Sequence, residues 1–116
     1  MIQGAGKVLR RIAGFVSHSY NYRGAIDMAG PDRVTGWVMN QTNTTHRPNI
    51  VVRVNQLPAG TGECSEFRLD LLNAGIGDGC YGFDVAIPGT SLTEDDTISV
   101  LVDGVHEIRY VPMSVT

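Results

Sequence analysis

Apolar residues follow two different periods along this chain, and the change of period falls near Tyr22. After Tyr22, short runs rich in Val, Ile and Thr alternate with turn residues, which is typical of an all-β domain. Before it, five apolar residues keep the spacing of one face of an amphipathic helix, namely Val8, Leu9, Ile12, Phe15 and Val16. The pattern therefore predicts an amphipathic helix or arm within residues 1–22 and a β domain over residues 23–116.

The β domain is predicted to hold about seven strands with turns between them. In chain order, the predicted strands span residues 23–29, 33–40, 49–55, 61–68, 80–87, 97–103 and 105–112. A helical turn is predicted over residues 69–74, just before a glycine-dense loop at residues 75–79. So many short strands in a chain of single-domain length favour two packed antiparallel sheets, in an immunoglobulin-like sandwich.

The clearest local signal is a hairpin centred on Asp103 and Gly104. The residues on both sides of this dipeptide alternate between apolar and polar, and Asp-Gly supplies the positive φ angles of a two-residue turn. A weaker form of the same pattern precedes Asn55, which is also able to form a turn.

Charge separates the two parts of the chain as clearly as hydropathy does. Residues 1–23 carry four basic residues and no acidic one, whereas the remainder carries five basic and twelve acidic residues. Glycines weaken the short N-terminal helix, so it is predicted to be marginal alone and to need a partner surface. We expect it to anchor the domain to a protein partner through Lys7, Leu9, Arg10, Arg11, Ile12 and Phe15. Packing on its own β domain is an equal alternative, and a lipid interface is less favoured because the stripe is barely two turns long.

Composition limits the other partners and the location of the protein. Because the basic residues of the β domain are scattered, we expect that domain not to bind nucleic acid. No apolar run approaches the length of a membrane span. The apolar stretch at residues 12–16 is too short for a signal peptide, so we expect cytoplasmic synthesis. An oligomer or an assembly at a virion or a cell surface fits these features.

Cys64 and Cys80 are the two cysteines of the chain. They flank a glycine-rich loop, so a disulfide between them is sterically conceivable. A chain without a signal peptide usually stays in a reducing compartment, which favours free thiols. Both states stay open at this point, whereas the spacing does not fit a cysteine-rich zinc site.

A series of short motifs in the β domain resembles a known family. In chain order they are Gly24-Ala25-Ile26-Asp27, Val34-Thr35-Gly36-Trp37-Val38, Arg68-Leu69-Asp70-Leu71, Gly75-Ile76-Gly77-Asp78-Gly79-Cys80-Tyr81-Gly82-Phe83 and Ile87-Pro88. The series is similar to the small β-sandwich accessory domain found beside bacterial glycosyltransferases and in other surface-glycan proteins. The resemblance covers roughly residues 22–112. It implies a sandwich without a catalytic centre that helps to bind or present carbohydrate.

A second function competes with carbohydrate binding, because no glycosyltransferase accompanies the domain in this chain. An acidic β-sandwich with a basic arm would also suit a structural or decoration subunit of a larger particle, such as a phage head or tail. This alternative rests on analogy between folds.

The polar segment at residues 41–48 is the best candidate for a recognition surface. It joins two predicted strands and offers amide, hydroxyl, imidazole and guanidinium groups, which are the groups that recognise sugars together with an aromatic face. The candidate ligand-binding residues are Asn43, Thr44, His46, Arg47 and Tyr81. A merely solvated connection is an equally strong interpretation of the segment.

The remaining notable side chains are interpreted as structural. Trp37 is expected to fill the space between the two sheets, and Arg68 with Asp70 is expected to lock the loop that runs to Gly79. The acidic run at residues 94–96 is interpreted as a solvated turn. No nucleophile–base pair, paired carboxylates in a cleft or metal triad is recognisable, so the sequence predicts no enzyme, no cofactor and no metal.

Overall fold

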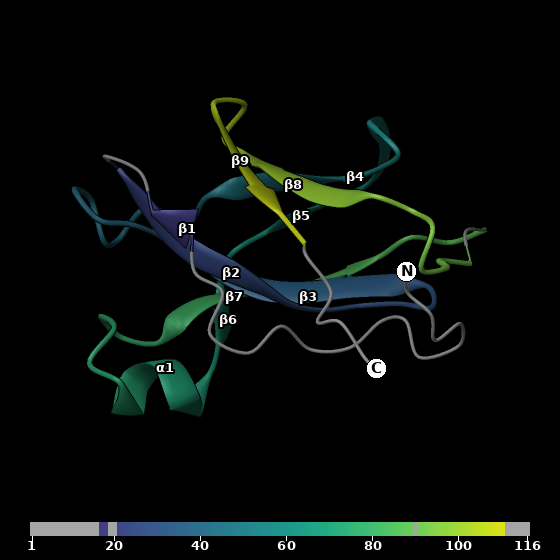
Figure 1. Ribbon diagram of the computed structural model, residues 1–116. Helices are drawn as coiled ribbons and strands as arrows, with labels where there is room; N and C mark the ends of the chain where they lie inside the picture. Colours follow the sequence, from purple (N-terminus) through teal and green to yellow (C-terminus); the bar gives the residue numbers. More distant parts are fainter. Residues whose placement is uncertain (1–16, 19–20, 90, 111–116) are drawn as a thin grey trace.

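A computed structural model describes residues 17–18, 21–89 and 91–110 of the chain. These residues form an all-β sandwich of two antiparallel sheets (Figure 1). The first sheet has five strands in the order β1-β2-β3-β7-β6, and the second has four strands in the order β5-β4-β8-β9. The predicted N-terminal helix and all six anchoring residues lie outside the described residues, and the immunoglobulin-like topology stays a prediction.

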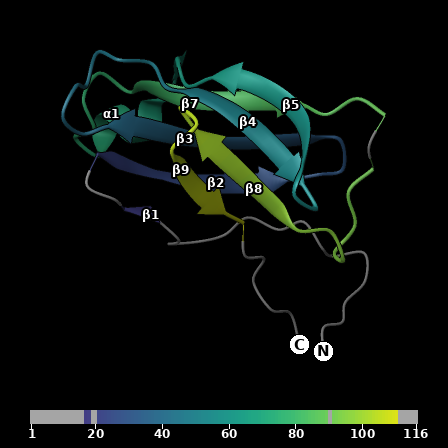
Figure 2. The same ribbon diagram turned by 90° about the horizontal axis from the view of Figure 1, so that it is seen from above.

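The five-stranded sheet combines strands from two separate stretches of the chain, the first ending at Asn40 and the second beginning at Glu66. Its strands are β1 (Ser17–His18), β2 (Tyr22–Ala29), β3 (Arg33–Asn40), β7 (Cys80–Ala86) and β6 (Glu66–Phe67). The four-stranded sheet comprises β5 (Leu57–Glu63), β4 (Asn49–Val54), β8 (Ile98–Val102) and β9 (His106–Arg109). Viewed from above, the second sheet covers the first (Figure 2). Contacts of β5 with β7 and of β9 with β2 bring the two sheets together along their sides.

The hairpin predicted around Asp103 is confirmed. Asp103 and Gly104 both have positive φ angles, 49° and 73°, and the Val105 amide donates a hydrogen bond of 2.9 Å to the Val102 carbonyl. The turn joins β8 directly to β9. An Asp-Gly pair favours this backbone because asparagine, aspartate and glycine tolerate the left-handed region better than other residues do.

One predicted strand was wrong in its bounds. Residues 61–68 were expected to form one strand, but β5 begins at Leu57 and ends at Glu63, and β6 follows separately in the other sheet. Asn55 and Gln56 adopt positive φ angles of 53° and 74°, so the chain turns back into β5 directly after β4. The glycines of β5 concealed the strand in the sequence. A Cβ atom at Gly60 would lie 2.8 Å from the Ala86 carbonyl oxygen, so the close approach of β7 requires glycine there.

The predicted helical turn is confirmed as α1 (Leu69–Asn73). Figure 1 shows α1 on the outer side of the five-stranded sheet, away from the four-stranded sheet. Leu71 is its buried residue, and Gly75, with a φ angle of 80°, follows its end. A glycine in this conformation directly after a helix is a common stop signal. No helix among the described residues is long and apolar enough to cross a membrane.

Apolar side chains form two separate clusters, one on each face of the five-stranded sheet. The main core lies between the sheets and includes Ile26, Val38, Val52 and Val100, all fully buried. The smaller cluster joins the other face of the sheet to α1 and the loop after it, and its members are Ala25, Trp37, Met39, Leu71, Ile76 and Tyr81.

Trp37 therefore lies on the opposite face from the one predicted. It is buried, but it packs under α1 and not between the two sheets. The next residue, Val38, belongs to the main core, and successive side chains of a strand point to opposite faces. Arg23 covers part of the indole, with its guanidinium carbon 5.8 Å from the ring centroid.

Candidate functional site

The predicted recognition segment lies at one end of the sandwich, between β3 and β4. Residues 41–45 are exposed. The turn is fixed from within, because the Asn40 side-chain oxygen accepts hydrogen bonds from the Thr42 amide, the Thr42 hydroxyl and the Asn43 amide at 2.9–3.1 Å. Thr45 donates a further hydrogen bond to the Asn43 side chain at 3.0 Å. This part of the surface is therefore held in one conformation.

Asp103 holds the second half of the segment to the β8–β9 turn. Its Oδ2 atom accepts hydrogen bonds from the Tyr22 hydroxyl at 2.8 Å and from His46 Nε2 at 2.9 Å. Its Oδ1 atom accepts one from the Asn49 amide at 2.9 Å. We call this arrangement the Asp103 latch, because one carboxylate joins β2, the recognition segment, β4 and the β8–β9 turn.

The latch changes the acid–base properties of its members. Burial acts to raise the pKa of Asp103, but the hydrogen bonds from Asn49, His46 and Tyr22 outweigh it, and the pKa lies below its ordinary value. Burial and the neighbouring Asp103 raise the pKa of Tyr22 to about 12. The ring of His106 stacks on Tyr22 with 5.6 Å between centroids, and burial lowers the pKa of His106. Asp103 is therefore a charged acceptor at neutral pH, with Tyr22 as a neutral donor.

Arg47 forms a second latch with the glycine-rich loop after α1. Its guanidinium pairs with Asp78 at 2.8 Å and donates a hydrogen bond of 2.7 Å to the Cys80 carbonyl. It also lies over the Tyr81 ring, 5.1 Å from the centroid. Tyr81 donates from its hydroxyl to the Thr44 carbonyl at 2.9 Å. We call this set of contacts the Arg47 latch.

The five candidate ligand-binding residues therefore come together, but in unequal roles. His46 and Arg47 hold the segment in place, and Tyr81 is 1% exposed, so its ring face cannot stack on a ligand. Tyr81 was predicted to take part in ligand binding, but its side chain is buried and its hydroxyl is bonded to the Thr44 carbonyl. Asn43 and Thr44 are exposed, and neither the Asn43 amide nitrogen nor the Thr44 hydroxyl bonds to another described residue. These two groups are the ones left to bind a ligand.

Arg68 and Asp70 form the paired structure expected of them, with an additional partner. The Arg68 guanidinium donates two hydrogen bonds to the Asp70 carboxylate, at 2.7 and 3.0 Å, and a third to Asp27 of β2. The Arg68 amide donates to the Gly79 carbonyl at 2.8 Å. The hydrogen bonds from Arg68 lower the pKa of Asp70. Arg68 thus ties α1 and its loop to the sheet, and Asp27 could not have been paired with it from sequence spacing.

Both cysteines are free thiols in this structure. Cys64 is buried and Cys80 is half-buried, and burial raises the pKa of the Cys64 thiol. The structure contains no disulfide bridge between them.

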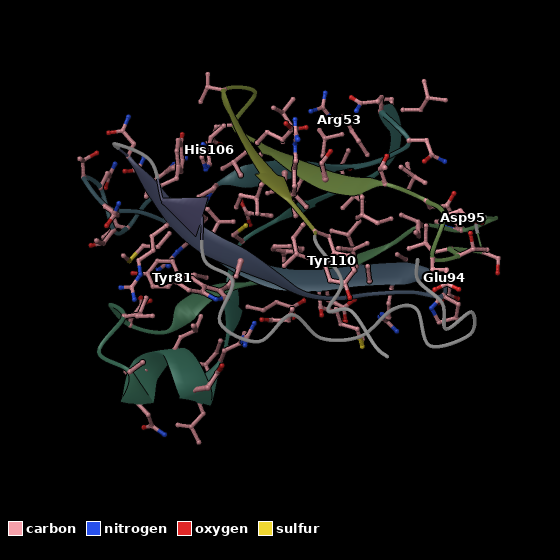
Figure 3. All side chains as sticks on the ribbon, viewed as in Figure 1. Arg53, Tyr81, Glu94, Asp95, His106 and Tyr110 are labelled. Carbon is pink, nitrogen blue, oxygen red and sulfur yellow. The ribbon has the colours of Figure 1, made fainter. Side chains whose placement is uncertain are left out.

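A hollow of about 350 Å³ opens at the other end of the sandwich. It lies among the β4–β5 turn, the acidic run before β8, and the outer end of β9. Figure 3 shows Glu94 and Asp95 at this end, away from Tyr81 and α1. The acidic run was interpreted as a solvated turn, and nothing in its spacing indicated that the chain would form a concave surface there.

No protein-family model, curated protein or solved structure matches this chain. In the described part of the chain, no three His, Cys, Asp or Glu residues are grouped so that they could hold a metal ion.

Proposed function

We propose that this chain is a non-catalytic β-sandwich module that binds carbohydrate through the exposed polar surface of residues 41–45. The observation that supports this most is the rigidity of that surface. The Asp103 latch and the Arg47 latch hold its base, and Asn40 holds its tip. A ligand would therefore meet preorganised amide and hydroxyl groups and would not have to order a flexible loop on binding.

The free groups of this surface suit a hydroxyl-rich ligand. The Asn43 amide donates, and the Thr44 hydroxyl both donates and accepts, so together they can satisfy neighbouring sugar hydroxyls. The surface has no aromatic stacking partner among its own exposed residues. We therefore expect millimolar affinity, which is consistent with an accessory module and with the family that the motif series resembles.

A glycan array probed with the full chain, followed by calorimetric titration of the best glycan, tests the proposal. Asn43→Asp retains the oxygen that accepts from Thr45 but removes the amide donor, and Thr44→Val removes a hydroxyl while leaving the backbone carbonyl. We expect the double variant to weaken binding about tenfold while the unfolding midpoint stays unchanged. Asn73→Asp, on the exposed end of α1, is the matched control and should bind as the wild type does. Equal affinity of the double variant and the control would refute the proposal.

A second candidate is an assembly subunit, in which copies of the chain contact one another. It is favoured by three exposed apolar side chains within six residues of β6 and α1: Phe67 is 55%, Leu69 60% and Leu72 43% exposed. Exposed large apolar residues that gather on one surface often mark protein contacts.

The assembly candidate predicts that the full chain self-associates through this surface. Sedimentation velocity over a wide concentration range should show a mass that increases with concentration, and Leu69→Ser should shift it to the monomer. Leu57→Ser, which removes a leucine on β5 that is 69% exposed, is the control and should leave the association unchanged. A wild-type chain that stays monomeric throughout would contradict this candidate.

A further inference from the structure

The exposed apolar surface of β6 and α1 is left uncovered by the rest of the described chain. Phe67, Leu69 and Leu72 are all exposed there, and we call these three side chains the β6–α1 patch. Leu69 and Leu72 are three positions apart, so they lie on the same face of α1, whereas Leu71 is buried in the cluster beneath the helix. Figure 1 shows α1 on the outer side of the five-stranded sheet, away from the second sheet. The β6–α1 patch is therefore open to a partner.

The β6–α1 patch has an acidic border. Three acidic residues accompany it in the sequence, Glu63, Glu66 and Asp70. The one guanidinium among them, that of Arg68, is already paired with Asp70 and Asp27. Glu63 and Glu66 are exposed, and neither side chain makes a hydrogen bond or ion pair with another described residue. A partner that combines an apolar face with basic side chains would complement this surface.

The N-terminal residues of the chain have the complementary composition. Five apolar residues keep the spacing of one helix face, and we call them the N-terminal stripe: Val8, Leu9, Ile12, Phe15 and Val16. Lys7, Arg10 and Arg11 flank the stripe, and the first acidic residue of the chain is Asp27. A helix this short needs a surface to pack on. The stripe would bring to the β6–α1 patch both an apolar face and positive charge.

The topology of the sheet decides which copy of the chain can supply the stripe. β1 begins at Ser17, directly after the stripe, and it lies at the opposite edge of the five-stranded sheet from β6. Four strand spacings of about 4.8 Å, or about 19 Å in total, separate the two edges. A helix over residues 8–16 is about 14 Å long and would end beside Ser17. It could not lie along Phe67 of its own chain, whereas the stripe of a second copy meets no such limit.

We propose that the N-terminal stripe of one copy of the chain docks on the β6–α1 patch of another copy, with Lys7, Arg10 and Arg11 beside Glu63 and Glu66. This inference rests on the assembly candidate described above, since it supposes that the patch joins copies of the chain. It names the segment that the second copy contributes to the contact. It also gives the basic N-terminal residues a role that sugar binding at residues 41–45 does not supply.

Charge reversal in two full-length variants tests the docking. Arg10→Glu/Arg11→Glu reverses the charge beside the stripe, and Glu63→Lys/Glu66→Lys reverses the charge beside the patch. Each variant alone then sets like charges against each other, so its self-association in sedimentation velocity should weaken about tenfold. In an equal mixture, the altered stripe of one chain meets the altered patch of the other, and association should return to within about threefold of the wild type.

Glu94→Lys/Asp95→Lys is the matched control, because it reverses two carboxylates at the end of the sandwich away from α1, and it should associate as the wild type does. A stripe variant that associates as strongly as the wild type overturns the inference, and the assembly candidate then stands if Leu69→Ser still gives a monomer. A mixture that stays as weakly associated as its two components also overturns the inference, because the stripe would then not pass between copies. A wild-type chain that is monomeric throughout overturns both and leaves the carbohydrate proposal unaffected.

Discussion

Asp103→Ala is expected to lower the free energy of unfolding by about 3 kcal/mol. The substitution removes the acceptor of the Tyr22 hydroxyl, His46 Nε2 and the Asn49 amide. Tyr22 is only 7% exposed, so water cannot fully replace the carboxylate as the acceptor of its hydroxyl. The φ angle of 49° at Asp103 adds to the cost, because alanine adopts that conformation less readily than aspartate.

Urea unfolding followed by Trp37 fluorescence measures the loss. Asp84→Ala is the matched control, because it also removes a carboxylate paired at 2.8 Å, in this case with Arg33 on the exposed surface. A surface pair of this kind contributes less than about 1 kcal/mol. If Asp103→Ala cost no more than Asp84→Ala, the Asp103 latch would not be holding the recognition segment.

The same latch has a pH signature. The folded-state pKa of Asp103 lies below its ordinary value of 3.8, so its contribution is fully present above about pH 4 and is lost as pH falls through the folded pKa. The wild type should therefore lose stability as the pH falls below about 4, and Asp103→Ala should lose less.

Trp37→Ala is expected to cost about 4 kcal/mol, the range found for large aromatic residues in cores. The indole is 6% exposed and packs with Leu71 and Ile76, so its removal would leave a cavity beneath α1. Because Trp37 belongs to the outer cluster, the substitution should loosen α1 more than the main core. Hydrogen exchange should therefore accelerate at the amides of α1 before it does at those of β8.

Trp37→Phe is the control for this prediction, since it retains most of the apolar volume and should cost clearly less than alanine. A loss below about 1 kcal/mol for Trp37→Ala would mean that the outer cluster does not stabilise the fold. Equal acceleration of exchange in α1 and β8 would mean that the two clusters are not separate.

The features that the sequence predicted well are local ones. The Asp103-Gly104 turn depends on two adjacent residues whose backbone preferences are strong, and the helical turn at α1 ends at a glycine. The bounds of β2 and β3 also follow closely from alternation and turn residues. Alternation alone could not tell which face of β3 meets the second sheet, because α1 gives both faces an apolar partner. Trp37 was assigned to the wrong face for that reason.

The features that the sequence did not reveal depend on distant contacts. Asp103 bonds to Tyr22, 81 positions earlier, and Arg68 bonds to Asp27, 41 positions earlier. A polar segment such as residues 41–48 looks the same in sequence whether it is solvated or latched. His46 and Arg47 were expected to meet a ligand, but the His46 ring and the Arg47 guanidinium make their hydrogen bonds inside the protein. The hollow was missed because its walls come from three separated stretches of chain.

The central question about this protein is whether the sandwich binds sugar at all. The decisive measurement is the amide NMR spectrum of the full chain with up to millimolar concentrations of the best glycan from the array and of the methyl glycosides of glucose, galactose and mannose. We predict saturable shifts at residues 41–45. A spectrum that does not change with any of these sugars would contradict the proposed carbohydrate binding.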